Sequence, residues 1–262
     1  MLAVRDFGLM NGRGLFVLTR RGVERFFAQW MESLAGPLAS SFLFLLVFVL
    51  ARGGRGDVWP GVDWASFIAG GIVMFAACHA AFESLAMNLL HDKMEGMMQD
   101  VVAAPLTALE IVLAWVAGAV VNGLVVGALV GLAMMAFVDW HLFWPLSSLL
   151  FAFLGVLLFA LVGLLVGLWA EKWDHYAFAE AFLILPLALL SGTFYLKEDL
   201  PPLGEILLQL NPVFYAFDGF RAGLLGRADS SAPIGQIYLL SLCLLLGVLA
   251  WRLVARSWRL KA

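Results

Sequence analysis

Long apolar stretches follow one another along almost the whole chain, separated by short polar segments. A helix needs about 20 apolar residues to cross the hydrocarbon core of a bilayer. These stretches show no alternation of apolar and polar residues, so helices rather than barrel strands satisfy their backbone in lipid. The pattern predicts an all-α membrane protein with six spans: Ser33–Ala51, Trp64–Phe82 running on to Leu90, Ile111–Val138, Leu142–Ala170, Ala181–Leu196 extended back through Tyr176, and Ser230–Trp251.

The segment before the first span has a different pattern. Val23, Phe26, Phe27 and Trp30 recur at helical spacing, opposite charged residues such as Arg25. This is typical of a helix lying in the membrane interface, and a generic membrane anchor would give the same pattern. We expect a single transmembrane domain over residues 1–262, with an interfacial segment at 1–32 and a six-helix bundle at 33–258.

Composition excludes an ordinary soluble fold, because 63% of the residues are hydrophobic and 13% are charged, against about 25% charged in soluble domains. Cys78 and Cys243 lie inside apolar runs and are expected to be small buried residues. No cleavable signal peptide is recognisable in residues 1–32.

The lysines and arginines predict the orientation, since cytoplasmic loops carry an excess of them. With six spans both termini share a side, and that side holds eleven of these residues against five on the other. Both termini are therefore expected in the cytoplasm. The eleven are Arg5, Arg13, Arg20, Arg21, Arg25, Lys93, Lys172, Arg252, Arg256, Arg259 and Lys261; the five are Arg52, Arg55, Lys197, Arg221 and Arg227.

The predicted cytoplasmic segment between the second and third spans reads HDKMEGMMQDVVAAPLTALE. It predicts a short amphipathic helix that stops before Pro105, because the residue before a proline disfavours the helical region. Thr107 and Glu110 then form a capping box for the next helix. A methionine-rich stripe suits docking against a partner, although a helix resting on the membrane would look the same. The stripe consists of Met94, Met97, Met98 and Val101, and the other face of Asp92, Glu95 and Gln99.

A second segment, residues 196–226, is predicted on the outer side. Pro201 and Pro202 are expected to break the fifth helix, and Gly204–Leu210 to form two helical turns. Asn211 is a good N-cap, Pro212 suits a first helical position, and Gly226 suits a C-cap. Two short helices dipping into the outer leaflet fit this segment, as does an ordered external loop. In the second helix Asp218 and Arg221 are spaced to pair.

Small and ionisable residues inside the spans are further candidates. Gly123, Gly127 and Gly131 allow close helix approach, either within the bundle or at a subunit interface. His79, Glu83 and Glu180 could form an ion pathway. Alternatively, the two glutamates lie near the boundary and are hydrogen-bonded, or paired with Lys93 or Lys172.

Signals for an enzyme are mostly negative. None of the lysines at 93, 172, 197 and 261 stands in a G-K-[ST] phosphate-binding loop. No G-x-S-x-G elbow, H-E-x-x-H motif or cysteine–histidine metal spacing occurs. We expect no catalytic residue, no metal and no cofactor on this chain, and no nucleic-acid partner.

Two stretches together resemble a known family. KMEGMMQDVVAAPLTALEI at residues 93–111 resembles the cytoplasmic loop of type-2 ABC exporter permeases. The later run from residue 185 to 226 is similar to that family's second signature, through L-S-G-x-F, L-P-P and N-P-x-x-Y-x-x-D-x-x-R. The resemblance covers nearly the whole chain and includes bacterial exporters of polysaccharides, lipo-oligosaccharides and drugs.

The resemblance implies a homodimeric permease in the bacterial inner membrane, with ATP and Mg²⁺ held by two separate ABC ATPase subunits. It implies that the N-terminal amphipathic helix is a connecting helix. Residues 92–104 would be the coupling helix that docks on the ATPase, and residues 200–226 a re-entrant pair closing the outer end. The coupling residues would be Asp92, Lys93, Met94, Glu95, Gly96, Met97, Met98, Asp100 and Pro105; the outer gate would comprise Leu200, Pro201, Pro202, Asn211, Pro212, Tyr215, Asp218 and Arg221.

Some departures limit the substrate assignment. The loop at residues 52–63 is short, and neither terminus carries a sugar-binding extension. These features weaken any particular polysaccharide assignment but do not exclude the class. The expected substrate is amphipathic, lipid-linked or drug-like. The alternative function is an ion-coupled secondary transporter that uses His79, Glu83 and Glu180.

Overall fold

The computed structural model describes residues 10–52 and 57–256. Four residues used to predict the orientation lie outside these ranges: Arg5, Arg55, Arg259 and Lys261. The regular structure of the described residues is helical, apart from an isolated bridge between Trp59 and Val62. Its elements are α1 (Gly12–Ala28), η1 (Met31–Ala35), α2 (Gly36–Arg52), α3 (Trp64–Met94), α4 (Met98–Ala103), α5 (Ala108–Met134), α6 (Pro145–Trp169), α7 (Trp173–Ala179), η2 (Glu180–Ile184), α8 (Leu185–Leu189), η3 (Lys197–Asp199), α9 (Pro202–Leu210), α10 (Pro212–Leu225) and α11 (Ala232–Ala255).

Five helices of the described residues are long and apolar enough to cross a membrane: Met31–Ala51, Trp64–Met94, Ala108–Met134, Pro145–Trp169 and Ala232–Ala255. They coincide with the first, second, third, fourth and sixth predicted spans. The predicted fifth span corresponds to the continuous run of α7, η2 and α8, which ends at Leu189 instead of Leu196. The run therefore ends well before Pro201 and Pro202, the prolines that were expected to break it. It ends there because the chain turns at Gly192, whose φ of 73° lies in the left-handed region.

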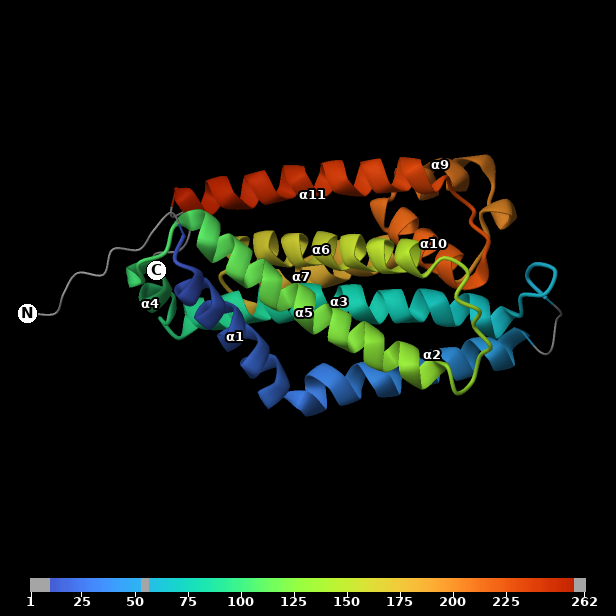
Figure 1. Cartoon of the computed structure of the whole chain (residues 1–262), viewed down its shortest axis with the longest axis horizontal. Coiled ribbons are helices and arrows are strands. Elements are labelled where there is room, and N and C mark those ends of the chain that lie inside the picture. The colour runs from blue at the N-terminus through green and yellow to red at the C-terminus, as the bar shows by residue number, and fades with distance from the viewer. Residues whose placement is uncertain (1–9, 53–56, 257–262) are drawn as a thin grey trace, which may run out of the picture.

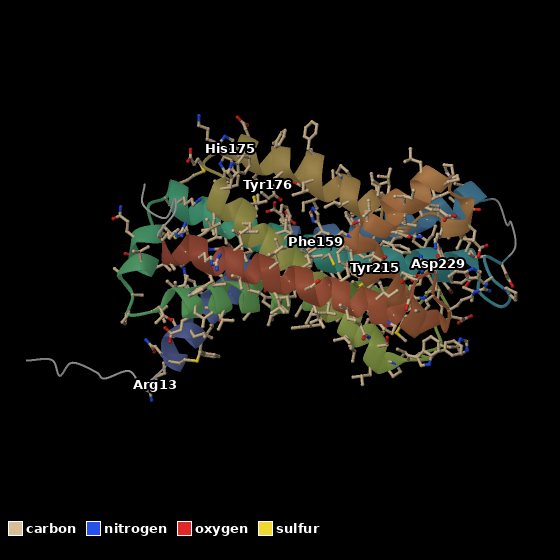
Figure 2. The ribbon with its side chains drawn as sticks, turned by 90° about the horizontal axis from the view of Figure 1, so that it is seen from above. Arg13, Phe159, His175, Tyr176, Tyr215 and Asp229 are labelled. Carbon is tan, nitrogen blue, oxygen red and sulfur yellow. The ribbon has the colours of Figure 1, made fainter. Side chains whose placement is uncertain are left out.

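The bundle has two distinct ends (Figure 1). The terminal end holds the start of α1, the short helix α4 and the carboxyl end of α11. The far end holds α9, α10 and the loop before α3. Figure 2, seen from above, places His175 and Tyr176 toward the terminal end and Tyr215 and Asp229 toward the far end.

Helix α3 lies at the centre of the bundle and packs against α5, α6, α10 and α2. Its side chains Phe67, Phe82 and Leu90 are fully buried. By contrast, α2 and α11 are mostly exposed, with apolar residues such as Phe44 and Leu244 on their surface. Exposed apolar helix faces of this length fit a hydrocarbon environment rather than water.

Residues 10–52 and 57–256 contain two wide helical turns, and a proline follows each at the same spacing. The π-turns η1 and η2 end at Ala35 and Ile184, and the prolines are Pro37 and Pro186. Proline lacks an N–H, and its ring collides with the carbonyl four residues earlier. A π-turn widens the helix at that point, so both runs continue past their proline.

Candidate functional site

The predicted coupling segment lies at the terminal end, but it does not form one continuous helix. Asp92, Lys93 and Met94 belong to the end of α3. The chain then turns at Gly96, whose φ is 73°, and α4 begins at Met98. The expected helix over 92–104 is therefore wrong in its first part, because a left-handed glycine ends α3 here. The predicted stop before Pro105 is confirmed, since α4 ends at Ala103.

Asp92 fixes α1 to α3. Its carboxylate is buried and accepts from Arg25 at 2.9 Å and from Arg21 at 3.2 Å. Arg25 also donates to the side-chain oxygen of Asn88 at 3.3 Å. These arginines of α1 thus face the protein, whereas Phe27 and Trp30 are exposed.

Lys93 fixes α3 to α6. Its ammonium donates to the carbonyls of Gly167, Leu168 and Ala170, which lie at the carboxyl end of α6. The last carbonyls of a helix lack partners within the helix and carry the negative end of its dipole, so a lysine is well suited to this position.

The methionine stripe is divided between the interior and the surface. Met98 and Val101 are buried in the core of this chain, so they offer no free surface. Met94 is half-exposed, and Glu95, Gln99 and Asp100 are exposed. The surface left for a partner is therefore more polar than the sequence pattern suggested, because two of the four stripe residues, Met98 and Val101, are buried.

The capping box at the start of α5 is confirmed. Glu110 accepts from the backbone N–H of Thr107 at 2.7 Å, while the Thr107 hydroxyl accepts from the N–H of Glu110 at 3.3 Å. The same carboxylate also accepts from the backbone N–H of Asn11, and the Asn11 amide donates to the carbonyl of Pro105. The start of α1 is thus joined to the start of α5.

At the far end, the caps of α10 form as predicted. Asn211 accepts from the N–H of Val213, and its amide donates to the carbonyls of Leu187 and Leu190. Pro212 is the first helical residue, and Gly226 ends the helix in the left-handed region. Around this helix, Leu200 is the C-cap of η3, Pro201 is the N-cap of α9 and Pro202 is its first residue. Tyr215 packs edge-on against Tyr238 of α11.

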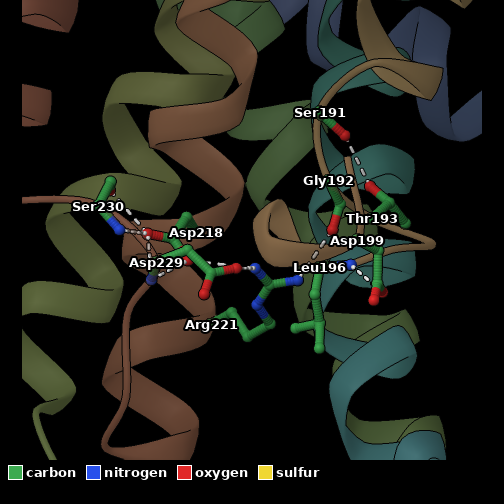
Figure 3. Close-up of polar contacts among 9 residues, drawn as sticks. All are labelled: Ser191, Gly192, Thr193, Leu196, Asp199, Asp218, Arg221, Asp229 and Ser230. Carbon is green, nitrogen blue, oxygen red and sulfur yellow. Dashed lines mark hydrogen bonds and ion pairs between the residues drawn. The ribbon is translucent and has the colours of Figure 1, made fainter. Parts of the chain in front are cut away.

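Arg221 and Asp218 form a buried pair on α10 (Figure 3). The Arg221 guanidinium donates to Asp218 at 3.1 Å and to the carbonyl of Gly192 at 3.0 Å. It also lies 3.9 Å from the ring centroid of Phe67 on α3. One side chain therefore joins α10, the turn after α8 and the start of α3.

The loop between α10 and α11 closes over the same pair. Asp218 accepts from the backbone N–H groups of Asp229 and Ser230 and from the Ser230 hydroxyl. Burial, followed by the charge of Asp218, raises the pKa of Asp229, although Arg221 acts in the opposite sense. Because the folded state holds this proton more tightly, the Asp229 carboxylate weakens the fold as pH rises through the raised pKa.

The ionisable residues of the predicted spans meet at one point. His79 lies 3.0 Å from Glu180 and 3.5 Å from Glu83. The alternative that these glutamates are hydrogen-bonded is confirmed for Glu180, and the partner that both contact is His79. The sequence could not predict this contact, because α3 and η2 meet only in the folded bundle.

The small residues of α5 face the bundle. A methyl group on Gly123 would lie 2.6 Å from the carbonyl oxygen of Ala77, and one on Gly127 would lie 2.8 Å from the Ala77 Cβ. Gly131 lies near Val73 at ordinary contact distance. These positions support packing within the chain.

Sequence reasoning missed three residues of the terminal end: Asn11, Arg21 and Arg25. Arg21 and Arg25 were assigned to the polar face of an amphipathic helix, and Asn11 was not singled out. Only the packing of α1 against α3 and α5 shows that this face meets protein.

Comparisons with known proteins agree with this architecture. The family described as ABC-2 type transporter matches residues 13–225. The "Inner membrane transport permease YadH" of Escherichia coli (strain K12) is 29% identical over 248 residues, which cover 92% of this chain and 94% of that protein. "Nodulation protein J" of Neorhizobium galegae is 26% identical over 232 residues, covering 84% of this chain and 85% of that protein. The chain therefore belongs to the ABC-2 type transporter family, as a permease that passes several times through the inner membrane.

Proposed function

We propose that two copies of this chain form the transmembrane path of an ATP-driven exporter. Family membership implies association with ABC ATPase subunits, and we assign ATP and Mg²⁺ to two such subunits. The proposed substrate is amphipathic, and either lipid-linked or drug-like.

The proposed topology has six spans and both termini in the cytoplasm. The run of α7, η2 and α8 is the additional span, and α1 is a helix in the cytoplasmic interface. Helices α9 and α10 enter the outer leaflet without crossing it and close the outer end of the path. This arrangement is supported by the shortness of α10, whose 14 residues fall below the roughly 20 that a span needs.

The observation that carries the proposal is the anchoring of the terminal-end turn, Glu95–Met97, and of α4. Immediately before this turn, Asp92 binds two arginines of α1, and Lys93 binds the carboxyl end of α6. A force applied to the exposed face of this segment would therefore reach α1, α3 and α6 together. That connection suits a segment that transmits the movement of a docked ATPase to the permease.

Coupling also requires a difference in binding. A docked ATPase shifts the permease between two states only if it binds them with different affinity. We propose that the exposed residues Glu95, Gln99 and Asp100 make the contacts that differ, while Asp92 and Lys93 keep the segment attached to the bundle.

The test reverses charge on the exposed face. The Glu95→Lys and Asp100→Lys variants should retain less ATPase during gentle purification, by about tenfold if one charge-assisted contact is lost. Mass spectrometry of copurified proteins, followed by ATP hydrolysis measurements on the complex, gives the readout. Lys93 is unsuitable for this test, because its substitution would also remove the hydrogen-bond donor of the last carbonyls of α6.

The matched control is Glu198→Lys, an exposed glutamate at the far end. It should retain the ATPase at the wild-type level. Equal retention in all three variants would contradict the assignment of the docking face. A chain that purifies without any ATPase and transports in vesicles under a proton gradient would instead favour the ion-coupled alternative through His79, Glu83 and Glu180.

A further inference from the structure

A cavity of about 250 Å³ lies between the end of α1, η1, α3 and the start of α7. A single water needs only about 10–15 Å³ by this kind of measure, so the cavity has room for a larger group. Its wall includes Gln29, Glu32, Glu83, Met87, His91 and Trp173. None of these residues belongs to the exposed face proposed to dock the ATPase.

The positive groups at this wall have acidic partners of their own. Arg25 is bound by the Asp92 carboxylate at 2.9 Å. His91 lies 3.2 Å from Glu95. Asp92 is shared with Arg21, so one positive charge of these two arginines remains, and it stands against the two carboxylates of the cavity wall, Glu32 and Glu83.

These carboxylates leave the cavity negative. Glu83 lies 3.5 Å from His79, whose other ring nitrogen is 3.0 Å from Glu180. One imidazole thus faces two carboxylates, and even a protonated histidine neutralises only one of them. Glu32 adds a further negative charge from the π-turn η1. An anionic ligand would be repelled here, whereas a cation would be attracted.

The remaining wall is aromatic and apolar. Trp173 can place its ring face against a cation, and ammonium groups bind tryptophan best among the aromatic side chains. Met87 and Phe26 provide apolar surface beside it. A metal ion fits poorly, because no group of three or more His, Cys, Asp or Glu side chains among the described residues is placed to hold one.

We propose that this cavity binds the protonated amine of an amphipathic molecule. Glu32 and Glu83 accept hydrogen bonds from the ammonium group, Trp173 covers it, and the apolar part of the molecule lies along Met87 and Phe26. The proposal rests on the proposed transport function and specifies its substrate class as amphipathic amines entering from the terminal side.

The test measures binding of dansylcadaverine, a fluorescent molecule with one primary amine, to the full chain in nanodiscs of zwitterionic lipid. Fluorescence anisotropy gives the dissociation constant. The matched probe is N-acetyl-dansylcadaverine, which has the same fluorophore without the charge. We expect the amine to bind about tenfold more tightly than the acetylated probe, the ratio that one charge-assisted hydrogen bond provides.

Two variants locate the binding site. Glu83→Gln and Glu32→Gln should each weaken binding of the amine about tenfold and leave the acetylated probe unaffected. Glu32 is exposed at the cavity mouth, so its substitution remains informative if Glu83→Gln disturbs folding. Glu24→Gln is the matched control, because Glu24 lies on α1 with its side chain 60% exposed and paired with Arg20 outside the cavity.

Equal affinity for the two probes, or wild-type affinity in Glu32→Gln, would overturn the proposal. The measurement uses the permease alone, so it is independent of the ATPase. Failure to copurify an ATPase would refute the proposed function while leaving amine binding intact. Loss of amine selectivity with a normally coupled ATPase would refute only the substrate class.

Discussion

At the residue scale, Arg221 is the largest of the fully buried side chains in the described part of the chain. Removing a charge from water costs several kcal/mol, unless an opposite charge and hydrogen bonds compensate it. Asp218 and the Gly192 carbonyl compensate the guanidinium, and the Phe67 ring covers its face. A planar guanidinium can satisfy all three contacts at once, which a lysine ammonium cannot.

We predict that Arg221→Met destabilises the protein by about 3–5 kcal/mol, the typical cost of breaking a buried ion pair. Arg221→Lys should lie between this variant and the wild type. Thermal unfolding in detergent, followed by tryptophan fluorescence, measures the effect. The control is Arg227→Met, which replaces an exposed arginine over the Trp59 ring. Loss of this contact should destabilise the protein by about 1 kcal/mol or less. Equal losses in the two methionine variants would contradict a stabilising role of the buried pair.

At the element scale, close packing of α6 on α3 depends on glycines that the sequence analysis did not single out. A methyl group on Gly163 would lie 2.5 Å from the carbonyl oxygen of Phe82. One on Gly167 would lie 2.9 Å from the Leu89 Cβ. Between apolar helices in lipid, such small residues allow the backbone contact that replaces a hydrophobic driving force.

We therefore expect Gly163→Ala to destabilise the bundle by about 1–3 kcal/mol, because the backbone of α3 must move away. This loss would exceed the gain of about 1 kcal/mol that alanine usually brings to a helix. Titration with sodium dodecyl sulfate measures unfolding. Gly247→Ala on α11 is the control, since no atom lies within 4 Å of the added methyl group, and it should be neutral or stabilising. An unchanged free energy of unfolding in Gly163→Ala would show that α3 and α6 can move apart without destabilising the bundle.

At the scale of the whole molecule, topology depends on the run of α7, η2 and α8. If this run crosses the membrane, α4 and Lys172 lie on one side and Glu198 on the other. Both native cysteines, Cys78 and Cys243, are buried, so an introduced cysteine can be labelled without interference from them.

We predict that Gln99→Cys and Lys172→Cys react with a membrane-impermeant maleimide only after the membrane is opened. Glu198→Cys should react in intact spheroplasts, because Glu198 follows the proposed fifth span on the outer side. The wild-type chain, with its two buried cysteines, is the control and should remain unlabelled. Reaction of Lys172→Cys and Glu198→Cys from the same side would contradict the six-span topology.

Local sequence was sufficient to determine the features that depend on neighbours in the chain. The capping box of Thr107 and Glu110, the start of α10 at Asn211 and its end at Gly226 were all predicted correctly. Their physical causes act within one helical turn, through backbone hydrogen bonds and left-handed glycine. The apolar runs predicted five of the long helices for the same reason, since hydrophobicity needs no knowledge of the partner helix.

Tertiary structure alone decided which side chains meet across helices. The partners of Asp92, Lys93 and His79 come from α1, α6 and η2, and the pattern around each residue does not reveal them. Likewise, half of the methionine stripe is buried because α4 packs against its own bundle. The physical reason is that a charge or an apolar face specifies a kind of partner, whereas the folded topology determines which partner lies within reach.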